Sequence, residues 1–153
     1  MNDATVSATS DTESFLSILE PELPKRAGDK IHWGNLKGNA PALAIAQAAL
    51  KLGECTLVIT PSMAEADRLE HDIQLFLRSE PNAPEVLHFA DWETLPYDTF
   101  SPHQDIISER MRTLYHLCNG GHHIVIVSAP ALLQRLPPID YILGNSLQLK
   151  KGD

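Results

Sequence analysis

Basic residues are scarce in this sequence of 153 amino acids. Lysine and arginine together number 12, against 20 aspartate and glutamate residues, which gives a formal net charge of -8. The few basic side chains are scattered along the chain, whereas proteins that grip nucleic acid gather them into a patch or stripe. The composition therefore argues against nucleic-acid binding by this chain alone.

Cysteine and long apolar runs are also scarce. The two cysteines, Cys55 and Cys118, form no CxxC pair, so we interpret both as reduced core or near-core thiols. No apolar run approaches the roughly 20 residues that cross a bilayer, and the N-terminus has no signal-peptide pattern. We expect a cytoplasmic protein without a membrane segment, and the 43% hydrophobic content is enough for one globular domain.

A complete phosphate-binding loop is missing as well. Such a loop needs the pattern G-x-x-x-x-G-K-[ST], whose lysine and hydroxyl hold phosphate and magnesium. The stretch from Gly34 to Asn39 lies where the loop would be, but its second glycine comes one residue early. Asn39 and Ala40 then replace the lysine and the hydroxyl. We interpret the stretch as a degenerate or structural turn that binds no nucleotide.

Two groups of reactive residues suggest catalysis or metal binding only at first sight. Ser101, His103 and Asp105 are nearly adjacent in sequence, whereas a hydrolase triad draws its members from separate elements. A helix cap at Ser101 and a favourable carboxylate in the first helical turn explain two of the three. His122-His123 with Cys118 lacks a second ligand pair at zinc spacing.

The carboxylates of Asp91, Glu93 and Asp98 form a third group, which could be an acid–base cluster or a metal site. Carboxylates this close on a loop are more often solvated, or paired with basic residues such as Arg110 or Arg112. We therefore predict no catalytic residue, no bound cofactor and no metal in this chain.

Helical and strand patterns alternate along most of the sequence. Apolar strands at this spacing, separated by helices, predict βαβ units, a parallel sheet and strands covered on both faces. The expected helices run from Asn39 to Gly53, from the Ser62 cap to about Arg78, from about Gln104 to Cys118, and from Pro130 to Arg135. The expected strands are Cys55 to Thr60, Val86 to Ala90 and Ile124 to Val127.

The two ends of the chain have less regular patterns. Residues 1–12 are polar and should be disordered, and Ser14 to Leu19 should form a short amphipathic turn or helix. Ile31 to Trp33 is a possible short strand. Tyr141 to Leu143 should lead through a Gly-Asn turn to a strand at 146–150. We therefore expect a domain at 13–138 and the start of a second at 139–153.

The least generic stretch lies between the strand ending at Ala90 and the helix beginning near Gln104. We call it the signature loop, and it occupies the edge of the sheet where α/β proteins usually bind ligands or partners. Its serine, proline and glutamine predict a capping box at the helix start. Its large apolar side chains should seal the end of the sheet, or alternatively form an exposed interaction surface. The candidate residues, which include one from the following helix, are Asp91, Trp92, Glu93, Leu95, Pro96, Tyr97, Phe100, Ser101, Pro102, His103 and Arg110.

The signature loop resembles the N-terminal region of the bacterial transcription-repair coupling factor (Mfd). The resemblance extends from Ile31 to the end and is most specific from Asp91 to Leu117. That region is in turn related to the N-terminal domains of UvrB, the helicase subunit of the excision nuclease. The resemblance implies a degenerate P-loop, helicase-like α/β domain similar to UvrB domain 1a. The first strand of a small UvrA-binding type of domain would follow it.

The same resemblance implies a non-catalytic scaffold or interaction module. In the family, the full-length protein is an ATP-driven DNA translocase that displaces stalled RNA polymerase and recruits UvrA for nucleotide excision repair. ATP, magnesium and DNA would be bound by motor domains beyond residue 153, and the partners of this segment would be other domains of the same protein. The alternative is a helicase-type domain that binds nucleotide or nucleic acid itself. The missing lysine after Gly38 and the negative charge count against it.

Overall fold

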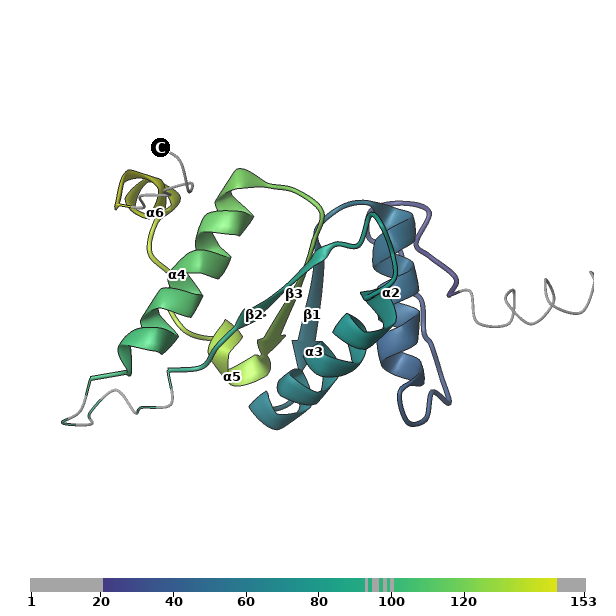
Figure 1. Cartoon of the computed structure of the whole chain (residues 1–153), viewed down its shortest axis with the longest axis horizontal. Coiled ribbons are helices and arrows are strands. Elements are labelled where there is room, and N and C mark those ends of the chain that lie inside the picture. Colours follow the sequence, from purple (N-terminus) through teal and green to yellow (C-terminus); the bar gives the residue numbers. More distant parts are fainter. Residues whose placement is uncertain (1–20, 93, 95–96, 98, 100, 146–153) are drawn as a thin grey trace, which may run out of the picture.

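A parallel sheet of three strands lies in the middle of the molecule (Figure 1). The computed structural model describes residues 21–92, 94, 97, 99 and 101–145. Its strands are β1 (Thr56–Thr60), β2 (Glu85–Phe89) and β3 (His123–Ser128). The order is β1-β3-β2, so β3 pairs in parallel with both neighbours. This confirms the predicted α/β fold with a parallel sheet.

Helices cover both faces of this sheet (Figure 1). Side chains of a strand alternate between faces, so Ile124 and Ile126 of β3 lie in one core, and Val125 and Val127 lie in the other. The first core is closed by α2 (Ala40–Leu52) and α3 (Met63–Leu77). The second core is closed by α4 (Gln104–Asn119), α5 (Ala129–Leu132) and α6 (Ile139–Asn145).

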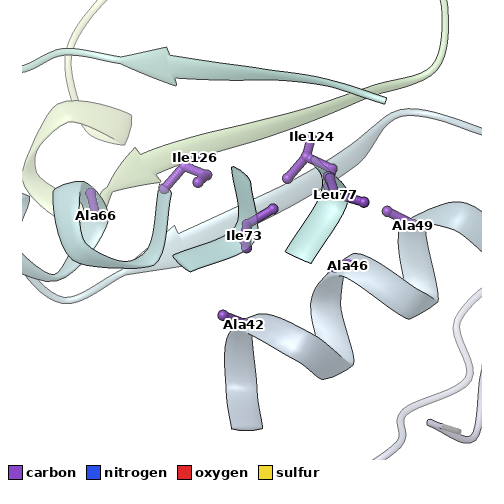
Figure 2. Packing of buried hydrophobic residues seen from close by; sticks show 8 residues of the cluster. All are labelled: Ala42, Ala46, Ala49, Ala66, Ile73, Leu77, Ile124 and Ile126. Carbon is purple, nitrogen blue, oxygen red and sulfur yellow. The ribbon is translucent and has the colours of Figure 1, made fainter. Parts of the chain in front are cut away.

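Small side chains allow α2 to pack closely in the first core. Figure 2 shows Ala42, Ala46 and Ala49 along one side of α2, facing residues of α3 and β3 such as Ile73. Each of these alanines is almost completely buried. A helix so rich in alanine has high intrinsic propensity and can approach its neighbours closely, which is why the helix is largely buried.

The local signals for helix ends are mostly confirmed. Gly53 follows α2 with a left-handed φ of 65°, which glycine adopts without a Cβ penalty, and its N–H bonds to the Ala49 carbonyl. The Ser62 hydroxyl accepts from the Glu65 N–H at the start of α3. The Ser101 cap is wrong: His103 is the N-cap of α4, with an extended ψ of 142°, and its Nδ1 accepts from Asp105 N–H.

The prediction that the strands are covered on both faces is wrong for β1. Leu57 and Ile59 are 55% and 54% exposed. Both share a sheet face with Val125 and Val127, their register partners, but the second core formed by α4, α5 and α6 covers β2 and β3. Within the described part of the chain, β1 is an edge strand with one open apolar face.

Three further expectations are corrected. Cys55 is exposed, because it precedes the edge strand, whereas Cys118 packs against the second core as predicted. Residues 31–33 form no strand. The expected turn at residues 144–145 is the end of helix α6, whose Ile142 is buried against the second core.

The predictions for residues 1–12, 14–19 and 146–150 lie outside the described residues. The domain limits at 138 and 139 stay predictions, although α6, which follows them, shares the second core with α4. In the residues that the structure describes, no helix is both long and apolar enough to span a membrane.

Candidate functional site

Arg110 of α4 packs against the start of the signature loop and is the most buried charged side chain among the described residues, with 1% of its surface exposed. Helix α4 holds its guanidinium 4.0 Å from the centre of the Phe89 ring and 4.2 Å from that of Trp92. Its Nη1 donates to the Ala90 carbonyl at 2.5 Å. Planar guanidinium groups stack well on aromatic rings and are weakly hydrated, so arginine suits this position better than lysine.

The surrounding charges explain how Arg110 is tolerated there. Burial lowers the pKa of the Arg110 guanidinium from its ordinary value, and the negative charge of Asp91 opposes that change. The Asp91 carboxylate accepts from the Trp92 N–H at 2.7 Å and from the Gln134 side-chain amide at 2.6 Å. These contacts fix the beginning of the signature loop to α4 and to the residues after α5.

The structure brings together only some of the predicted site residues. Asp91, Trp92 and Arg110 lie together, and Trp92 is half-buried with its ring against the Arg110 guanidinium. That Trp92 seals the end of the sheet stays a prediction. Tyr97 does not share this role, because it is 97% exposed. Some of the remaining candidates are exposed or half-buried, and the others lie outside the described residues. Ser101 and His103 are exposed and Pro102 is half-buried, whereas Glu93, Leu95, Pro96, Asp98 and Phe100 lie outside.

A buried histidine that contacts two carboxylates was not predicted from the sequence. His88 lies in β2 with its Nδ1 2.7 Å from Glu70 Oε2 and 3.6 Å from Asp67 Oδ1, both on α3. The hydrogen bond to Glu70 raises the pKa of His88 above its ordinary value, and burial opposes this. A single histidine inside an otherwise apolar strand was the available signal, but only the fold shows which helix faces it.

The open face of β1 adjoins two hollows. One, of about 70 Å³, lies between Leu57 and the chain around Leu132 and Leu136. The other, of about 680 Å³, follows β1 beside α2 and the segment that contains Trp33. Both are lined mainly by apolar side chains, and both include Leu57. We call the exposed side chains of Leu57 and Ile59 the apolar face of β1, which Leu132 and Leu136 border.

The histidines near residue 120 are separated by the fold. His122 Nε2 lies 2.9 Å from the Ala49 carbonyl, and Cys118 packs against the second core. His123 instead lies with Glu85 and His116, at the amino ends of β2 and β3. Cys118, His122 and His123, which were considered from the sequence as a metal site, therefore do not lie together.

These features define a parallel α/β domain whose sheet is closed at one end by a buried arginine and is open along one apolar edge. Comparison of the sequence with known proteins then shows what the domain is similar to. No family model matches the chain. The transcription-repair-coupling factor of Haemophilus influenzae is 41% identical over 137 residues, which is 90% of this chain. That of Escherichia coli is 42% identical over 130 residues, or 85% of this chain.

The chain is therefore homologous to the transcription-repair-coupling factors, which confirms the resemblance predicted from the signature loop. More distant members include that of Staphylococcus aureus, 29% identical over 120 residues. The chain spans only 12% and 11% of the length of the Haemophilus and Escherichia proteins. It thus aligns with only a small part of each of these two relatives.

Proposed function

We propose that this chain is a non-catalytic scaffold and interaction module of a transcription-repair-coupling factor. The observation that carries the proposal is the apolar face of β1, where large aliphatic side chains of a regular strand remain half exposed. Relatives that align with most of this chain are many times longer. The covering partner that we propose is another segment of the same long polypeptide.

The physical argument starts from the cost of leaving β1 open. Fully burying a leucine or isoleucine side chain contributes roughly 1.5 to 3 kcal/mol, so covering Leu57 and Ile59 provides a substantial driving force. An edge strand also presents unpaired backbone N–H and C=O groups that can pair with another strand. The hollow of about 680 Å³ beside β1 adds further apolar surface. A segment of the same protein, held at high effective concentration, suits such a surface well.

The turn before α2 supports a helicase-like ancestry without nucleotide binding. Gly38 and Asn35 have positive φ values of 59° and 61°, so the backbone is tightly turned. The exposed Lys37 precedes the last glycine, and Asn39 directs its amide to Asp72 at 3.5 Å. We infer a degenerate P-loop of the UvrB domain 1a type, in which the phosphate-binding lysine and hydroxyl have been lost.

In this proposal the activities of transcription-coupled DNA repair belong to the full-length protein in the cytoplasm. ATP hydrolysis, magnesium binding and DNA translocation reside in other domains. Contacts with UvrA and RNA polymerase are likewise made through the whole protein. This module supports the remaining domains through the apolar face of β1.

Hydrogen exchange tests the proposed contact. We expect the amides of 56–60 to exchange at least about tenfold more slowly in the full-length protein than in the 153-residue chain, because a covering segment adds hydrogen bonds and burial. Equal protection of these amides in the full-length protein and in the 153-residue chain would contradict the proposal.

A pair of matched variants sharpens the test. Leu57→Glu should leave the stability of the 153-residue chain nearly unchanged but should remove the extra protection of β1 in the full-length protein. Leu75→Glu is the control, since Leu75 is 56% exposed, like Leu57, but lies on α3. It should leave that protection intact.

A further inference from the structure

We propose that Glu85, His116 and His123 form a binding site for a divalent transition metal such as Zn²⁺. One potential ligand atom from each side chain lies within 4.8 Å of the others. The residues come from three elements, since Glu85 begins β2, His123 begins β3 and His116 lies in the last turn of α4. The site is at the opposite end of the strands from Arg110.

The sheet itself places two of the three ligands side by side. Glu85 and His123 are register partners in the parallel pair β2 and β3, so their side chains share one face. Oε2 of Glu85 lies 3.5 Å from His116 Nδ1 and 3.9 Å from His123 Nδ1. Ligand atoms about 2.1 Å from a tetrahedral zinc are roughly 3.4 Å from one another. Small side-chain rotations would therefore suffice to surround a cation.

A hydrogen bond already orients His123 for binding. Its Nε2 lies 3.2 Å from the Gly120 carbonyl, which can only accept, so Nε2 carries the proton and Nδ1 presents its lone pair. Nδ1 is buried and has no hydrogen-bond partner among the residues that the structure describes. Metal-bound histidines commonly donate their other N–H to a backbone carbonyl in this way. The arrangement accounts for an otherwise unsatisfied buried nitrogen.

The Glu85 carboxylate is also held in position by a residue outside the proposed site. Arg112 Nη2 donates to Glu85 Oε1 at 2.7 Å, which leaves Oε2 facing the two histidines. The imidazole rings of His116 and His123 pack edge to face, with centroids 5.5 Å apart. A set of two imidazoles and one carboxylate favours zinc, cobalt, nickel or copper over magnesium or calcium, which prefer oxygen ligands.

The test is a titration of the metal-free 153-residue chain with Zn²⁺, and with Co²⁺ as a spectroscopic probe. We expect one equivalent to bind, the visible absorption of Co²⁺ to indicate nitrogen and oxygen ligands, and the melting temperature to rise on binding. His116→Ala and His123→Ala should each weaken binding by about tenfold or more. Arg112→Ala should weaken metal binding less, because this substitution removes only a contact outside the ligand set.

Control variants distinguish this site from adventitious binding. His103→Ala should bind metal normally, since His103 is exposed and pairs with Asp105. If a variant fails to fold, as judged by circular dichroism, the conservative His116→Gln replaces it. Absence of saturable binding would overturn the proposal, and so would equal affinity in wild type, His116→Ala and His123→Ala.

Discussion

At Arg110 a full positive charge is held in a nearly dry environment. The side chain is stabilised by two aromatic rings and by the Ala90 carbonyl, and the nearby Asp91 charge favours its protonated form. A second buried titratable side chain, His88, lies against the carboxylates of Glu70 and Asp67. Both residues link a helix to the strand β2 or its end.

The first prediction is that Arg110→Ala lowers the free energy of unfolding by about 2 to 4 kcal/mol. It removes the ring contacts and leaves the Ala90 carbonyl without its donor. Urea unfolding in the presence of a metal chelator is the measurement. Arg112→Ala is the control on the same helix, because its exposed pair with Glu85 should contribute no more than about 1 kcal/mol. Equal losses for the two variants would contradict a special role for Arg110.

A second prediction concerns pH. The folded-state pKa of His88 lies above its ordinary value of 6.5, so the folded protein binds this proton more tightly than the unfolded chain. The resulting stabilisation is complete below about pH 6.5 and is lost as the pH rises through the folded pKa. Glu70→Gln should therefore cost more stability at about pH 5.5 than at about pH 8.5.

Urea unfolding at the two pH values measures this difference. Glu80→Gln, at an exposed position beyond α3, is the control and should show no such dependence. A cost for Glu70→Gln that does not change with pH would show that the charge of His88 is not involved.

At the scale of elements, the two cores differ in the size of the side chains that their helices contribute. Helix α2 presents alanines to α3 and β3, whereas α4 presents larger residues such as Leu114 to β2 and β3. Because small side chains leave no spare volume between α2 and its neighbours, the first core should tolerate enlargement poorly.

The third prediction follows from that packing. Ala46→Leu should destabilise the domain by about 1 to 3 kcal/mol, since Ala46 is 2% exposed and lies in the same core as Ile73 and Leu77. Thermal unfolding is the measurement. Ala64→Leu, at an exposed position of α3, should change stability by no more than about 0.5 kcal/mol. If Ala46→Leu were equally mild, the interface would be looser than the structure shows.

At the scale of the whole molecule, one side of the sheet is left incomplete. Among the described residues, β1 has a single strand neighbour, and its apolar face stays half exposed. The chain aligns with a small part of each coupling factor. An edge strand of this kind is a liability in an isolated domain and an attachment surface in a large protein.

The sequence determined the elements by itself. Apolar periodicity, the serine at 62 and the glycines at 53 and 120 are local signals, so helices α2 to α5, the three strands and most of their ends could be predicted. Helix α6 was not predicted. The signature loop was equally sufficient to point to the coupling factors as relatives. Helix α4 begins at Gln104 as predicted, but its cap was assigned to Ser101 instead of His103, because the choice between these two residues depends on the local backbone conformation.

Only the tertiary structure decided which residues meet. An apolar strand has the same pattern whether it is central or at an edge, so the exposure of Leu57 depends on strand order. Glu85 and His123 are 38 positions apart in numbering and become neighbours only through the parallel register of β2 and β3. Burial of Arg110 likewise requires α4 to pack across the end of β2. Contacts between distant residues depend on the packing of whole elements, which no local pattern encodes.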